Sequence, residues 1–83
     1  MIVIVDERER VKEGFSSLFG REGIASTGFG GNEFGEWVST AADADLKSVG
    51  AFLIGECESQ HFSPRMIRER TGAPVIALNE QHS

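Results

Sequence analysis

The stretch MIVIVDE at residues 1–7 indicates both the class of fold and the first candidate site. Residues Ile2–Val5 are four consecutive β-branched residues, a pattern typical of a strand that is covered on both faces in a parallel sheet. This predicted strand ends at Asp6 and Glu7. In open α/β sheets ligands bind beyond the carboxyl ends of the strands, so the acid pair lies where a functional site is expected.

Helix and strand patterns alternate along the rest of the chain. Apolar residues recur at helical spacing in the first two predicted helices, and Ser63-Pro64 marks the start of a third. We expect Gly20 to end the first helix, Asn32 to cap the second and Gly72 to end the third. The predicted strands cover residues 2–5, 23–29, 49–54 and 74–78, and the predicted helices cover residues 9–19, 32–41 and 64–71.

This β-α-β-α-β-α-β order predicts an α/β fold. Short connections between alternating elements imply right-handed crossovers and a parallel sheet with helices on both faces. The first strand is expected in the centre and the second at an edge, which corresponds to the flavodoxin-like (CheY-like) strand order 2-1-3-4. With 83 residues the chain forms one small domain at most.

The charge balance excludes some classes of partner. Eight basic and 13 acidic residues give a formal net charge of −5, which offers no basic surface for nucleic acid or for an anionic membrane. The apolar run at the N-terminus is too short to span a membrane and no basic region precedes it. We therefore expect a cytoplasmic protein whose first 83 residues do not themselves bind DNA.

Several segments resemble the receiver domain of bacterial response regulators. The shared features are the opening strand with its acid pair, residues 52–54, residues 66–68 and residues 74–78. Two longer segments, SLFGREGI at Ser17–Ile24 and EFGEWVSTAAD at Glu33–Asp43, are more specific. They are similar to the N-terminal part of flagellar transcriptional regulators of the OmpR-like response-regulator type. The resemblance covers essentially the whole chain.

The resemblance implies a regulatory module of a two-component transcription regulator that controls flagellar genes. It also implies that residues 1–83 are a truncated receiver domain, which lacks the last helix-strand-helix of the fold and any DNA-binding domain. DNA would then be bound only through a C-terminal domain. A bare fourth strand beside an uncovered sheet face is a template for association, so we expect a homodimer or an exchange of elements between two copies.

Most of the residues that carry out phosphorylation in the family are not found at the matching positions of this sequence. Asp6 and Glu7 match the acids that hold magnesium, but Gly55 stands where the phosphoryl-accepting aspartate is expected. Asn79 stands at the switch position that normally carries a hydroxyl, and the matching lysine would lie beyond Ser83. Two acids alone supply few ligands for octahedral Mg²⁺, so any metal binding is expected to be weak or vestigial, with no other cofactor.

Three alternatives remain open. Asp6 and Glu7 can instead cap and charge the first turn of the helix that follows them, where each carboxylate contributes about 0.3–1 kcal/mol. A phosphorylatable receiver would need a displaced acceptor such as Glu56, although a side chain one residue further along a strand points to the opposite face. A flavodoxin-like module that binds a small anion is the third. The expected function is non-enzymatic and independent of phosphorylation, acting through dimerisation or protein contacts.

Overall fold

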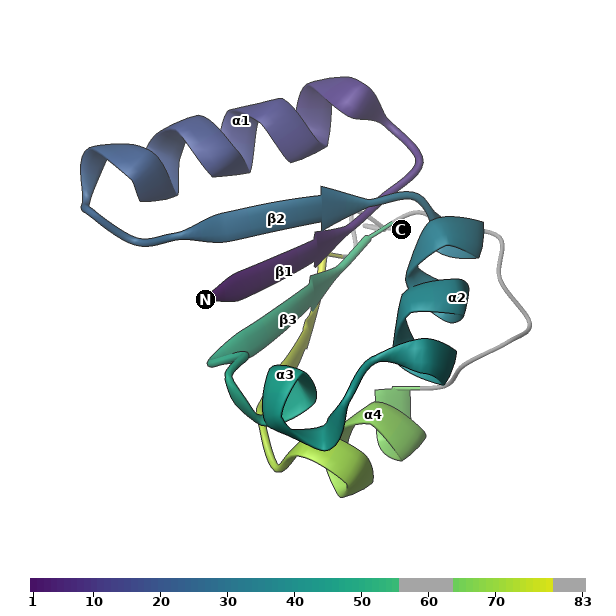
Figure 1. Ribbon diagram of the computed structural model, residues 1–83. Coiled ribbons are helices and arrows are strands. Elements are labelled where there is room, and N and C mark those ends of the chain that lie inside the picture. The colour runs from purple at the N-terminus through teal and green to yellow at the C-terminus, as the bar shows by residue number, and fades with distance from the viewer. Residues whose placement is uncertain (56–63, 79–83) are drawn as a thin grey trace.

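The computed structural model describes residues 1–55 and 64–78, which form a four-stranded parallel sheet with helices on both faces (Figure 1). The elements in chain order are β1 Ile2–Val5, α1 Glu9–Arg21, β2 Ser26–Phe29, α2 Gly31–Thr40, α3 Asp43–Lys47, β3 Ala51–Ile54, α4 Pro64–Thr71 and β4 Val75–Ala77. The strand order is β2-β1-β3-β4, which confirms the predicted order with β1 in the interior.

The register of the sheet aligns the carboxyl ends of its three longer strands. Val5 at the end of β1 pairs with Phe29 on one side and with Ile54 on the other. The ladder continues one residue further, because the N–H of Asp6 donates to the Phe29 carbonyl at 3.0 Å and the N–H of Gly55 donates to the Val5 carbonyl at 2.7 Å. Asp6 and Gly55 are therefore neighbours at one edge of the sheet.

The main core lies between the sheet and the helices α2 and α4 (Figure 1). Aromatic rings fill it: Phe34 of α2 meets Phe52 of β3 edge to face, with ring centroids 5.8 Å apart. Trp37 stacks on Phe29 at 5.3 Å. Burying a large apolar side chain of this kind contributes roughly 1.5–3 kcal/mol. The aliphatic members of this core are Val3, Val5, Val38, Val49, Ile67 and Ala73.

The opposite face of the sheet is covered more thinly. Among the described residues α1 is the helix on this face, where it packs against β2 and β1 (Figure 1). None of the α1 residues is fully buried. Leu18 of α1 is 47% exposed and Ile76 of β4 is 48% exposed. Apolar side chains are therefore exposed to solvent both on α1 and on the edge strand β4. No helix in the described part of the chain is long and apolar enough to cross a membrane.

The first helix ends later than the sequence pattern predicted. Gly20 lies inside α1, and the left-handed residue is Gly23, with φ 77°. The N–H of Ile24 donates to the Phe19 carbonyl at 2.9 Å and the N–H of Gly23 donates to the Gly20 carbonyl at 3.1 Å. These two bonds form a Schellman motif, which selects the second of two closely spaced glycines as the left-handed residue. The expected glycine after α4 is confirmed, because Gly72 has φ 74°.

The second predicted helix also differs at both ends. Asn32 is not its cap, because α2 begins at Gly31 and its N-cap is Gly30, whose N–H donates to Oε1 of Glu33 at 2.8 Å. Between α2 and β3, where the sequence pattern predicted no further element, Asp43–Lys47 form the short helix α3. Acids in the first turn and a buried Leu46 stabilise this helix. The predicted cap Ser63 lies outside the described residues.

Candidate functional site at the carboxyl edge of the sheet

Asp6 is the polar side chain at the centre of this edge. It follows β1 directly and its side chain is fully buried. The guanidinium of Arg8 forms a bidentate pair with the carboxylate: Nε donates to Oδ1 at 2.9 Å and Nη2 donates to Oδ2 at 2.9 Å. The backbone N–H of Arg8 donates to Oδ1 as well, at 2.8 Å. Such a forked pair is among the strongest hydrogen-bonded arrangements in proteins, so Asp6 is neutralised by its own chain.

This ion pair is local and asymmetric. Arg8 lies two residues after Asp6, at the N-cap position of α1, and its side chain remains 36% exposed. A buried carboxylate is costly unless it is paired and hydrogen-bonded, so the pairing satisfies Asp6 rather than adding an independent contact. The Arg8 guanidinium therefore compensates the charge of a carboxylate that is itself removed from solvent.

Glu7 serves a different helix from the one predicted. Its Oε2 accepts the N–H of Gly31 at 2.9 Å, and Gly31 is the first residue of α2. This carboxylate satisfies a helix N-terminal donor and lies at the positive end of the helix dipole. The expectation that the acid pair caps α1 is therefore wrong for Glu7. The N-cap Arg8 of α1 makes no side-chain capping bond, although its N–H is held by Asp6.

Gly55 is the neighbour of Asp6 at the end of β3. A Cβ atom built on Gly55 would overlap Oδ2 of Asp6 and would lie 3.1 Å from its Cγ. The Asp6 carboxylate thus occupies the space that a side chain at position 55 would need. Alternation along the strands places Asp6 and Gly55 on the same sheet face, which accounts for this close approach. The absence of a side chain at position 55 is a steric requirement of the Asp6–Arg8 pair.

The described residues at this edge do not fit a bound Mg²⁺, the ion that the receiver resemblance implies. Both oxygens of Asp6 accept hydrogen bonds from Arg8, one oxygen of Glu7 accepts from Gly31, and Gly55 has no side chain. Octahedral Mg²⁺ needs several oxygen ligands that are available to it. Within residues 1–55 and 64–78 no group of three or more His, Cys, Asp or Glu side chains is placed to hold a metal.

Two residues singled out from the sequence lie outside the described residues. They are the switch position Asn79 and the alternative acceptor Glu56. Of the other candidates, the structure brings Asp6 and Gly55 together and directs Glu7 towards α2. Sequence reasoning missed Arg8. The sequence signal that could have found Arg8 is a basic residue two positions after an acid at the end of a strand. In a turn at this spacing the basic side chain can reach the carboxylate.

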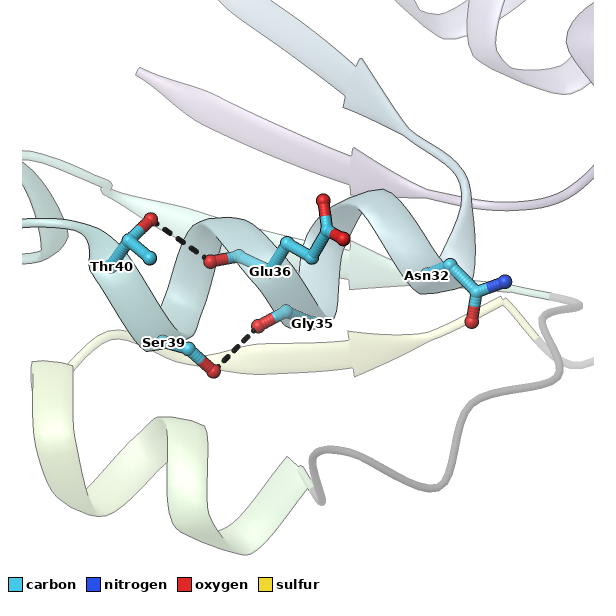
Figure 2. A pocket seen from close by; sticks show the side chains of 5 residues that line it. All are labelled: Asn32, Gly35, Glu36, Ser39 and Thr40. Carbon is cyan, nitrogen blue, oxygen red and sulfur yellow. Dashed lines mark hydrogen bonds between the residues drawn. The ribbon is translucent and has the colours of Figure 1, made fainter.

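A hollow lies on the surface of α2 (Figure 2). Its described lining residues all belong to α2: Asn32, Gly35, Glu36, Ser39 and Thr40. The Ser39 hydroxyl donates to the Gly35 carbonyl at 2.9 Å, and the Thr40 hydroxyl donates to the Glu36 carbonyl at 3.0 Å. Both hydroxyl protons are thus used within the helix, and this lining contains no pair of groups arranged as nucleophile and base.

Comparison with known proteins gives one consistent result. No family model matches the chain, and no solved structure matches it. The chain is similar to FtcR along its whole length. It is 55% identical over 83 residues to the flagellar transcriptional regulator FtcR of Brucella abortus, of Brucella suis and of Brucella melitensis. The similarity includes 100% of this chain and 37% of each relative, so the chain spans little more than a third of their length.

The similarity to flagellar transcriptional regulators confirms the narrower part of the resemblance noted from Ser17–Ile24 and Glu33–Asp43. The strand order agrees with the flavodoxin-like fold expected of a receiver. Membership of the receiver and OmpR-like groups remains a prediction.

Proposed function

We propose that this chain is the regulatory module of a transcription regulator of flagellar genes, built as an atypical receiver that works without phosphorylation. The observation that carries the proposal is the set Asp6, Arg8 and Gly55 at the carboxyl edge of the sheet. The acceptor position has no carboxylate, and the neighbouring carboxylate is held by a guanidinium. The similarity to FtcR supports the flagellar part of the proposal.

The chemistry of the edge supports a non-enzymatic role. Phosphoryl transfer to a receiver needs a carboxylate nucleophile and a divalent cation that neutralises the developing charge. Gly55 cannot be phosphorylated, and Asp6 is buried and paired with Arg8. The signal would then reach the module through protein contacts or through the amount of the regulator in the cell.

A second copy of the chain is the proposed partner. The edge strand β4 carries Ile76, which is 48% exposed. On α1, which packs against β2 and β1, Leu18 is 47% exposed. Apolar surface next to an edge strand favours self-association. We do not assign DNA binding to residues 1–83, because they carry a net charge of −5. A transcription regulator of this kind acts in the cytoplasm.

The intact mass of the chain, measured after incubation with Mg²⁺ and acetyl phosphate, tests the proposed absence of phosphoryl transfer. We expect no phosphoryl adduct, while a phosphorylatable receiver treated in parallel gains one. A stoichiometric adduct on this chain would overturn the proposal. Loss of the adduct in Glu56→Gln would then identify the displaced acceptor. Aspartate at position 55 is a poor positive control by itself, because it would overlap Asp6.

The flagellar role needs a separate test in the cell. Deleting the gene is expected to lower the transcripts of flagellar genes, and expression of the wild-type protein or of a Glu56→Gln variant is expected to restore them equally. Unchanged flagellar transcripts in the deletion strain would contradict the assignment to flagellar regulation.

A further inference from the structure

We infer that the Arg8 guanidinium is a built-in cation, which fills the acidic edge of the sheet and excludes divalent metal ions from it. The inference rests on the proposed function and concerns the same edge of the sheet. The proposed function concerns the missing phosphoryl acceptor, whereas the inference concerns the cation that occupies the edge. Neither outcome determines the other, because an edge without an acceptor can still bind a metal.

The first support is the way in which Arg8 uses the carboxylate. Three N–H groups of this one residue donate to Asp6: Nε and the backbone N–H to Oδ1, and Nη2 to Oδ2. A metal ion at Asp6 would have to replace at least one of these bonds. The planar fork of arginine matches a carboxylate in two places, which a spherical ion with a tightly held water shell does not do.

The second support is that Arg8 and Asp6 are close neighbours in the sequence. The two residues are separated by one position, and the same backbone turn that starts α1 brings the N–H and the guanidinium of Arg8 to Asp6. The local concentration of this cation at Asp6 is therefore far above that of a free ion, as for any tethered ligand.

The third support is the position of the carboxylate itself. Oδ2 of Asp6, the atom that accepts Nη2 of Arg8, lies where a Cβ of residue 55 would be. Asp6, Arg8 and Gly55 thus depend on one another: the glycine leaves room for the carboxylate, and the arginine holds it there. The second acid of the edge is also engaged, because Glu7 accepts the N–H of Gly31.

The test is a Mn²⁺ titration of the ¹⁵N-labelled chain, followed by paramagnetic broadening of the amide signals at Asp6, Glu7 and Gly55. We expect no selective broadening in the wild type. Arg8→Gln removes the cation while keeping a side chain of similar length, so it is expected to bind Mn²⁺ at least tenfold more tightly, in competition with Mg²⁺. The matched control is Arg10→Gln, which removes the same charge from an exposed residue of α1 and is expected to behave like the wild type.

Selective broadening of these amides in the wild type, at an affinity equal to that of Arg8→Gln, would overturn the inference. So would an Arg8→Gln variant that is folded and gains no Mn²⁺ affinity. If Arg8→Gln does not fold, the inference is tested by the Mn²⁺ titrations of the wild type and of Arg8→Lys. The lysine keeps the charge but loses the fork, so its Mn²⁺ affinity is expected to rise above that of the wild type; an unchanged affinity would contradict the inference. A phosphoryl adduct on the wild type without metal broadening would contradict only the proposed function.

Discussion

The carboxyl edge of the sheet and the face covered by α1 differ in what they leave for a partner. At the edge, the polar groups of Asp6, Arg8 and Glu7 bond to one another or to the start of α2. On the α1 face, apolar side chains such as Leu18 and Ile76 remain about half exposed. Among the described residues, the polar groups at the edge where a receiver would perform its chemistry are engaged with one another or with α2, while Leu18 and Ile76 on the α1 side are not covered.

This contrast suggests where the signal enters the molecule. A small ligand or metal at the edge would have to break hydrogen bonds of a buried ion pair. A protein at the α1 face would bury apolar surface and would not need to displace an existing polar partner. The difference favours regulation through protein contacts over regulation through a small phosphoryl donor.

Substitution of Gly55 is expected to have the largest effect on the contrast. Gly55→Asp places a second carboxylate where Oδ2 of Asp6 already lies, so it should lower the free energy of unfolding by about 3 kcal/mol or more. Gly55→Ala should cost about 1–3 kcal/mol through overpacking alone. Urea unfolding followed by Trp37 fluorescence measures both variants.

The matched control for Gly55 is Gly14, which lies inside α1 with no atom within 4 Å of an added Cβ. Gly14→Ala should stabilise the chain by about 0.5–1 kcal/mol, because alanine is the better helix former. If Gly55→Ala is as harmless as Gly14→Ala, the Asp6 carboxylate does not require the space at position 55.

Removing the guanidinium of Arg8 is expected to have the next largest effect. Arg8→Gln removes the guanidinium that is paired with the buried Asp6 carboxylate, which should cost about 2 kcal/mol, less than for a fully buried pair because Arg8 is 36% exposed. Arg10→Gln removes an exposed charge from the same helix and should change stability by less than about 0.5 kcal/mol. If urea unfolding gave the same loss of unfolding free energy for both variants, the Asp6–Arg8 pair would contribute no more to stability than an exposed charge does.

Glu7 should give a smaller effect, confined to α2. Glu7→Ala removes the acceptor of the Gly31 N–H and a favourable charge at the helix N-terminus, at a cost of about 1 kcal/mol. Glu13→Ala in α1 is the control, and a change within about 0.5 kcal/mol is expected there. Hydrogen exchange at the first turn of α2 should accelerate in Glu7→Ala only. Unchanged exchange would argue against the capping role.

The α1 face should show the smallest effect on stability and the clearest effect on association. Ile76→Lys on the exposed edge strand should change the unfolding free energy by less than about 1 kcal/mol. Sedimentation of the wild type is expected to show a dimer, and Ile76→Lys should shift it towards the monomer. A wild type that remains monomeric at high micromolar concentration would contradict the proposed homodimer.

The sequence was sufficient for the strand order and for the edge of the sheet at which the candidate site lies. A run of β-branched residues that ends on polar residues indicates where a buried parallel strand ends. The carboxyl ends of parallel strands lie at the same edge of the sheet. For this reason Asp6 and Gly55 could be assigned to the same edge of the sheet, although the close contact between them was not predicted. The glycine at position 55 was understood as a lost acceptor, but its steric role depends on the rotamer of Asp6, which a sequence pattern does not specify.

Other features depended on competition between similar local signals. Gly20 and Gly23 can both end α1, and only the complete Schellman bonding selects Gly23. Asn32 is a good cap by residue type, yet Glu33 reaches the N–H of Gly30 and starts α2 earlier. The link from Glu7 to Gly31 joins residues 24 positions apart, so it follows from the tertiary fold alone.

A double-mutant cycle on Asp6 and Arg8 tests the central claim most directly. Asp6→Asn, Arg8→Gln and the double variant are compared with the wild type in urea unfolding. Because the forked pair joins a buried carboxylate to its own cation, we expect a coupling free energy of about 1–3 kcal/mol. The double variant should then be nearly as stable as the better single variant. A coupling within about 0.3 kcal/mol of zero would show that the edge is not closed by this pair.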